Sequence, residues 1–157
     1  MPDQPDFFAA VDKLGTFREL DVDALRYVYR VERVGETFYE RIAERVGNAE
    51  AERLLLQNAR EERGHAERLR RALTLKLGRD WQPAAEDFAP YPIPLPDAIG
   101  ADLLAAIVAG ELSGDKSYQE WADRESNPEI QKLLRQNGHE EIVHSQRVEA
   151  VLEILRR

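Results

Sequence analysis

The chain has 157 residues, which fits a single domain with a sizeable core, and it carries a formal net charge of −8 at pH 7. This negative balance argues against nucleic acid and against an anionic membrane surface as partners. Because the chain contains no cysteine, it excludes disulfides, catalytic thiols and iron–sulfur clusters held by its own residues.

The N-terminal residues 1–6 are acidic and proline-rich, without the basic and apolar segments of a signal peptide. Residues 7–14 can form a short helical lead-in that ends at Gly15. The most apolar run, around residues 103–108, is too short to span a bilayer. We therefore expect a cytoplasmic protein that has no membrane partner.

Helical periodicity predicts two long helices in the first half of the chain, over about 21–46 and 48–77. Asp21 and Asn48 are suitable N-caps, and Gly78 is a suitable C-terminal stop. Glu32 falls on an otherwise apolar stripe of the first helix. A glutamate in that position needs a cation or a proton, because burying an isolated charge is costly.

Residues 79–97 differ from the helices on either side, since they hold five of the eight prolines. A helix of 30 residues is about 45 Å long, and 19 extended residues reach about 59 Å. The segment is thus long enough to cross the length of a bundle. The segment could instead be a boundary between two separate helical hairpins. We disfavour this alternative, because each hairpin would then carry only half of the candidate metal ligands described below.

The second half repeats the pattern, with helices predicted over about 97–125 and 127–156. Asn127 and Pro128 form a strong start signal for the last helix. The sequence therefore predicts an all-α protein, in which residues 1–157 form one four-helix domain with a long proline-rich crossover at 79–97.

The two halves are related by an internal repeat. When residues 32–65 are aligned with residues 111–144, 14 of 34 positions are identical, where unrelated sequences would give about 2. The shared positions include two Glu-x-x-His motifs and one glutamate 30 residues before each motif. Together they give six candidate metal ligands: Glu32, Glu62, His65, Glu111, Glu141 and His144.

One glutamate from each of two helices and a Glu-x-x-His from each of the other two is the ligand set of a two-metal site inside a four-helix bundle. Four carboxylates balance two divalent cations, and two metals at close spacing suit bridging by Glu62 and Glu141. Each histidine would then bind one metal. Mixed carboxylate and imidazole ligands suit two iron ions, with manganese or zinc as alternatives.

These motifs resemble those of the ferritin-like superfamily, and most of all its rubrerythrin branch. The resemblance is carried by Ala109-Gly110-Glu111 with Tyr118 seven residues on, and by the two Glu-Glu-x-x-His phrases at 61–65 and 140–144. It covers roughly residues 22–157. It implies a bundle holding a non-haem di-iron centre that reacts with peroxide or dioxygen.

Two features depart from the rubrerythrin pattern. Rubrerythrins carry a rubredoxin-like domain with four cysteines, and this chain has none. They also usually carry another glutamate three residues after the ligand of the third helix, where this chain has Gly114. The resemblance therefore leaves open how electrons are supplied and whether the metals shift position during turnover.

Several residues beside the ligands have two interpretations. Tyr39 and Tyr118 are either packed aromatics or, as we favour, hydrogen-bond donors to the ligand carboxylates. Glu36 and Asp115 are either reserve ligands or surface groups. Glu61 and Glu140 are expected either to orient the histidines or to contact solvent. His139 is expected to lie outside the core, and Trp121 to serve packing.

We expect an enzyme, a di-iron oxidoreductase that reduces peroxide or activates dioxygen with electrons from an external donor protein. The alternatives are a ferroxidase or iron-handling protein, which would assemble into a cage, and a hydroxylase, which would need an apolar pocket beside the metals. The equivalent hairpins and the long crossover further predict a homodimer, with or without exchange of hairpins between subunits.

Overall fold

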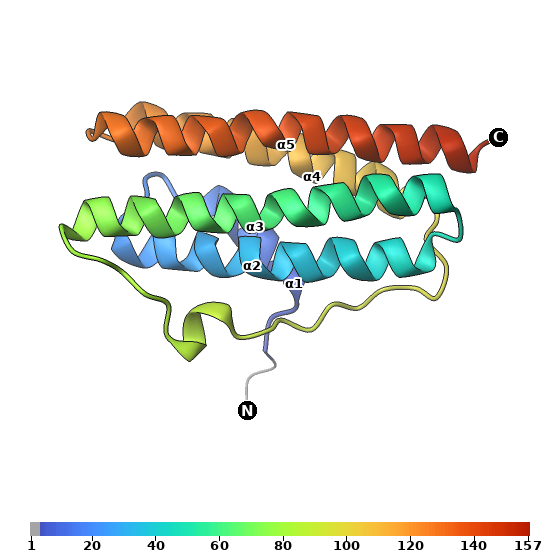
Figure 1. Ribbon diagram of the computed structural model, residues 1–157, viewed down its shortest axis with the longest axis horizontal. Helices are drawn as coiled ribbons and strands as arrows, with labels where there is room; N and C mark the ends of the chain where they lie inside the picture. The colour runs from blue at the N-terminus through green and yellow to red at the C-terminus, as the bar shows by residue number, and fades with distance from the viewer. Residues whose placement is uncertain (1–3) are drawn as a thin grey trace.

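The computed structural model describes residues 4–157, which form helices and no strands in that range. A short helix, α1 (Phe7–Lys13), precedes four long ones: α2 (Val22–Arg45), α3 (Ala49–Leu77), α4 (Ala101–Arg124) and α5 (Pro128–Leu155). Helix α2 pairs with α3, α4 pairs with α5, and α3 lies beside α5 to join the two hairpins (Figure 1). The prediction of an all-α helical bundle is confirmed.

The long helices begin where polar side chains can replace missing helical hydrogen bonds. Asp21 accepts a hydrogen bond from the Ala24 backbone N–H at 2.8 Å, and Asn48 accepts one from Ala51 at 3.0 Å. Asn127 accepts from the backbone of Glu129 at 2.9 Å, with Pro128 in the first turn. These caps place the hairpin turns where the sequence predicts them.

Helix α4 begins at Ala101, four residues later than predicted. Residues 97–100 are non-helical, and Gly100 takes an extended conformation as the N-cap. The physical reason is packing: Ile99 lies in the same buried cluster as Leu104, so an apolar contact fixes the entry into the helix, as in a hydrophobic staple. Asp97, where the sequence predicts the helix to begin, therefore lies outside it.

The segment between α3 and α4 runs the length of the bundle along α2 (Figure 1). Two arginines of α2 hold it there. Arg26 pairs with Asp87 at 2.9 Å in a short 3-10 turn, Ala85–Phe88, which the sequence did not predict. Arg30 donates to the Ala89 carbonyl at 2.8 Å and stacks 3.7 Å from the Tyr91 ring centroid.

The apolar core consists of two clusters separated along every long helix. One contains Phe38, Leu55, Leu104 and Val148, and the other contains Leu25, Leu69, Trp121 and Leu134. On each helix the predicted metal ligands fall between residues of the two clusters. A polar layer is thus enclosed above and below by apolar side chains, where charges interact strongly.

Candidate metal centre

The six predicted ligands lie together in this polar layer. Glu32 comes from α2, Glu111 from α4, and α3 and α5 each supply one glutamate and one histidine. All six are buried, with both histidines fully inaccessible to solvent. The helical spacing of three residues puts the glutamate and histidine of each motif on one face of the helix. The full set is Glu32, Glu62, His65, Glu111, Glu141 and His144.

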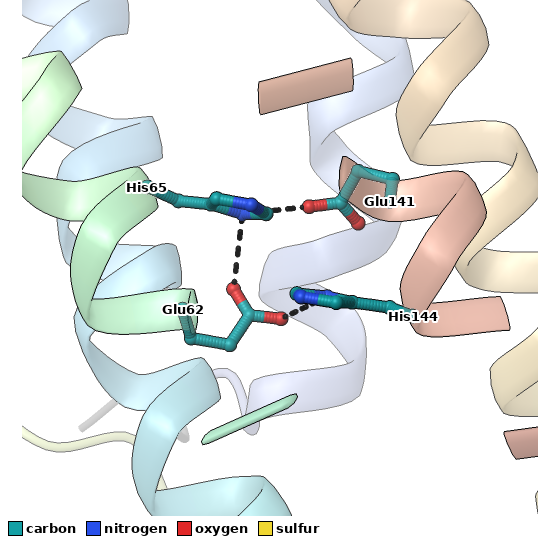
Figure 2. Close-up of side chains that lie close together, drawn as sticks. All are labelled: Glu62, His65, Glu141 and His144. Carbon is teal, nitrogen blue, oxygen red and sulfur yellow. Dashed lines mark ion pairs between the residues drawn. The ribbon is translucent and has the colours of Figure 1, made fainter. Parts of the chain in front are cut away.

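Four of these residues form the centre of the layer. Glu62, His65, Glu141 and His144 each offer one ligand atom, and these atoms lie within 4.8 Å of one another (Figure 2). His65 Nδ1 lies 2.8 Å from Glu141 Oε1 and 3.5 Å from Glu62 Oε2. His144 Nδ1 lies 3.4 Å from Glu62 Oε1. Glu62 therefore faces both imidazoles, as a shared ligand would.

The two remaining glutamates flank this group, one at each imidazole. Glu32 Oε2 lies 3.5 Å from His65 Nδ1, and Glu111 Oε2 lies 3.9 Å from His144 Nδ1. The imidazole rings themselves stack with centroids 5.0 Å apart. Each histidine thus has one flanking glutamate of its own, which divides the six residues into two equivalent sets.

The polar atoms of the layer do not satisfy one another. Among the described residues, no contact of a ring nitrogen of His65 or His144, or of Glu141 Oε1, has the geometry of a hydrogen bond, although His65 Nδ1 and Glu141 Oε1 lie 2.8 Å apart. Buried polar groups in folded proteins are nearly always paired, so such a cluster needs an explanation. Cations bound between the carboxylates and the imidazoles would supply it, since both groups are ligands for divalent metals.

The carboxylates also resist carrying full charge together. Burial, followed by repulsion from Glu62, raises the pKa of Glu32 to about 8. Burial and the charge of Glu111 raise the pKa of Glu141 well above its ordinary value. Burial acts in the same sense on Glu62, but the close approach of Glu32 and of both histidines outweighs it and holds that pKa well below its ordinary value. Without cations, the layer must therefore hold protons at neutral pH.

Two tyrosines donate hydrogen bonds to the flanking glutamates, and they do so across the bundle. Tyr39 of α2 donates to Glu111 Oε1 of α4, and Tyr118 of α4 donates to Glu32 Oε1 of α2. Burial raises the pKa of both phenols well above the ordinary value, so they remain neutral donors. Each tyrosine thereby fixes the carboxylate that belongs to the opposite hairpin.

A second polar arrangement lies behind each histidine, on the side away from the carboxylates. Glu140 Oε1 lies 3.6 Å from His65 Nε2, and Arg68 Nη1 lies 2.9 Å from Glu140 Oε2. Arg68 also donates to Asn137 Oδ1 at 3.0 Å, and Asn137 Nδ2 donates to the His65 carbonyl at 3.2 Å. Burial works against ionisation of Glu140, but His65 and Arg68 hold its pKa at about 2.

The other half has the same arrangement, built from the repeat partners of these residues. Arg147 pairs with Glu61 and donates to Asn58 Oδ1 at 3.0 Å. Asn58 Nδ2 donates to the His144 carbonyl at 3.2 Å, and Glu61 Oε1 lies 4.0 Å from His144 Nε2. Sequence reasoning missed both arginines. Extending the repeat comparison by three positions would have found them, since Arg68 aligns with Arg147.

The family model for rubrerythrin matches residues 7–91, which is more than half of the chain. The chain belongs to the rubrerythrin family. The matched segment contains α1, α2 and α3 and therefore the first three candidate ligands. Comparison with curated proteins and with solved structures gave no significant match. Within residues 4–157, no helix is both long and apolar enough to cross a membrane.

This rubrerythrin domain has a glycine where the family resemblance predicts an additional glutamate. A Cβ atom at Gly114 would lie 3.1 Å from Glu141 Oε2, and one at Gly35, its repeat partner, would lie 3.3 Å from Glu62 Cδ. The two glycines therefore leave room for the two central carboxylates. A side chain at either position would therefore require the neighbouring carboxylate to move by a few tenths of an ångström.

The other residues with two interpretations lie at the edge of the site or beyond it. Glu36 pairs with the exposed Arg63 at 2.5 Å, and Asp115 is half-buried beside Gln119. His139 is exposed, and Trp121 is buried with its indole Nε1 donating to the Phe17 carbonyl at 2.9 Å. None of these four belongs to the central group of imidazoles and carboxylates.

Proposed function

We propose that this protein is a di-iron oxidoreductase that reduces peroxide or dioxygen with electrons from an external donor. The observation that carries the proposal is the buried, unsatisfied set of imidazole nitrogens among four carboxylates. Hydrogen bonding within the protein leaves these atoms unpaired, and their chemistry fits two divalent cations. Membership in the rubrerythrin family supports iron as the metal.

The proposed ligands divide between two metal positions. His65 with Glu32 would hold one ion and His144 with Glu111 the other, while Glu62 and Glu141 would be shared. When bound, two iron ions supply two electrons at once to a small oxidant. The surrounding apolar clusters exclude bulk water, which strengthens every electrostatic interaction in the layer.

The protein's own residues contribute orientation and proton handling. Tyr39 and Tyr118 hold Glu111 and Glu32 in place from the opposite hairpin. Glu140 and Glu61, each anchored by an arginine, face the outer nitrogens of the histidines and would orient the rings. Glu32 holds a proton in the metal-free state, and cation binding would release it.

The dimensions of the site favour a small oxidant over a bulky substrate. Two surface hollows, of about 380 and 260 Å³, are lined by residues other than the proposed ligands. A methyl group added at Gly114 or Gly35 would already crowd a central carboxylate, at 3.1 Å from Glu141 Oε2 or 3.3 Å from Glu62 Cδ. A hydroxylase would need an apolar pocket beside the metals to hold its substrate, so these contacts support reaction with peroxide or dioxygen.

The test is anaerobic titration with Fe(II), followed by mixing with hydrogen peroxide or with dioxygen. We expect two iron ions per chain and rapid oxidation of both by at least one oxidant, with the faster oxidant identifying the substrate. His139→Ala is the matched control, because this histidine is exposed. A protein that binds less than one iron ion per chain would contradict the proposal.

A further inference from the structure

The two halves of the site differ in one side chain that can be oxidised. Tyr39 and Tyr118 are repeat partners, and each donates to a flanking glutamate. Three residues further along the helix, α2 carries Ile42 and α4 carries Trp121. The half that contains Tyr118 therefore continues into a second side chain that can be oxidised, whereas the other half continues into an aliphatic one.

Tyr118 and Trp121 form a continuous contact that begins at the metal layer. The Tyr118 hydroxyl donates to Glu32 Oε1, and its ring centroid lies 5.2 Å from the Trp121 ring at an angle of 82°. The counterpart Tyr39 instead packs edge-on against Phe38, with ring centroids 5.6 Å apart. Phenylalanine is much harder to oxidise than tryptophan, so the Tyr39 half lacks an equivalent second carrier at this contact.

The far side of Trp121 reaches a hollow at the protein surface. This hollow has a volume of about 260 Å³, and its lining includes Trp121 together with Lys76, Arg124 and Glu125. Lys76 and Glu125, both in the lining, form an ion pair at 3.0 Å. Trp121 is only 3% exposed, but because it lines the hollow, a reductant bound there would lie beside the indole ring, while the carboxylates and imidazoles remain buried.

We propose that Tyr118 and Trp121 carry single electrons from this hollow to the Glu32 side of the metal site, an inference that rests on the proposed function. Tyr118 gives one electron to the oxidised site and its phenolic proton to Glu32. The tyrosyl radical then takes an electron from Trp121 and recovers the proton from Glu32. A one-electron reductant in the hollow restores Trp121, so one electron has moved and both side chains are unchanged.

The chain contains a matched control pair. Trp81 contacts Tyr29 with the same centroid separation of 5.2 Å at an angle of 80°. Tyr29 belongs to the apolar cluster, where it packs with residues such as Leu25 and Leu69. Oxidation of Trp81 can therefore pass to a tyrosine in the apolar cluster instead of one bonded to Glu32.

The first test follows radical transfer between these two side chains in protein loaded with zinc, a redox-inert ion. The Trp81→Phe variant leaves Trp121 as the only tryptophan, and pulse radiolysis with azide radicals oxidises it. Because the same contact carries an electron in either direction, we expect the tryptophanyl absorption to equilibrate with tyrosyl absorption at a rate independent of protein concentration. Adding Tyr118→Phe, which removes only a hydroxyl group, should slow this conversion at least about tenfold.

The second test measures turnover of iron-loaded protein with peroxide and ferrocyanide as the one-electron reductant. Trp121→Phe should slow ferrocyanide oxidation at least about tenfold, whereas Trp81→Phe should leave it unchanged. Equal radical transfer with and without Tyr118→Phe, or equal turnover in the two tryptophan variants, would overturn the electron path. A wild-type protein that binds no iron or consumes no peroxide would instead overturn the proposed function.

Discussion

Substituting Gly114 with alanine tests whether the space beside Glu141 serves metal binding. Helix α4 offers a matched control four residues away, because a Cβ added at Gly110 would meet no atom of residues 4–157 within 4 Å beyond its chain neighbours and the adjacent helix backbone. Both substitutions replace glycine inside the same helix, which on propensity alone stabilises the fold by about 1 kcal/mol. Only at Gly114 does the new methyl group meet a proposed ligand, at 3.1 Å from Glu141 Oε2.

The magnitude follows from these two effects. For a domain of this size, 1 kcal/mol shifts the melting temperature by roughly 2–4 °C. We expect Gly110→Ala to raise the melting temperature by about that amount with and without metal. A contact of 3.1 Å forces the Glu141 carboxylate to move by a few tenths of an ångström, so Gly114→Ala should weaken metal binding about tenfold, or roughly 1.4 kcal/mol.

The assay is thermal unfolding of each variant in chelator and in excess Fe(II) under anaerobic conditions. Metal that binds only the folded state stabilises it by about 2.7 kcal/mol at 100 times the dissociation constant. A tenfold weaker site should therefore lose about half of that stabilisation. Equal metal-dependent shifts for Gly114→Ala and Gly110→Ala would refute the reasoning. Gly35→Ala should give a smaller loss, since its Cβ would lie 3.3 Å from Glu62 Cδ.

The stabilising effect of metal should increase with pH. The pKa of Glu32 rises from 4.5 to about 8 on folding without metal, so its contribution to stability is complete below pH 4.5 and is lost as pH rises through 8. The melting temperatures of chelated and metal-loaded protein should therefore diverge across this window, and a constant difference would contradict it. Elemental analysis should show that His65→Ala and His144→Ala each lose about one metal ion per chain while His139→Ala loses none, and depletion by His139→Ala alone would disprove the ligand assignment. Light scattering should give a homodimer at all accessible concentrations, and a monomer would rule out the proposed assembly.

The internal repeat made most of the site predictable from sequence. Its identical positions mark the six residues that the structure brings into one layer, although their role as ligands stays a prediction. The repeat also contains Arg68 and Arg147, which lie outside the compared windows. The sequence could not show that Tyr39 bonds Glu111 and Tyr118 bonds Glu32, because helical periodicity gives the face of a helix and not the helix opposite.

Local signals located some helix ends better than others. Asn127 and Pro128 fix the start of α5, because a side-chain cap and a proline act within one turn. The start of α4 depends instead on burial of Ile99 against the core, a contact between distant parts of the chain. Propensity therefore placed that start near Asp97, which is wrong by four residues. The 3-10 turn at Ala85–Phe88 also depends on a distant partner, Arg26.

Residues that are the same in both halves of the repeat are those proposed to bind metal, whereas a residue that differs between the halves is the one proposed to supply electrons. Each half carries three of the six proposed ligands, one of the two tyrosines and one of the two arginines. The halves can therefore hold two metals in equivalent ways. At the repeat position shared by Ile42 and Trp121, only the second half has a tryptophan, although either an aromatic or an aliphatic side chain would fill a core there. The symmetry of the two halves suits two equivalent metal positions. Electrons from one donor need only a single path from the protein surface to the metals. The asymmetric residue is thus the one expected to determine where a reductant acts, and its neighbours Lys76 and Glu125 determine the surface that this reductant meets.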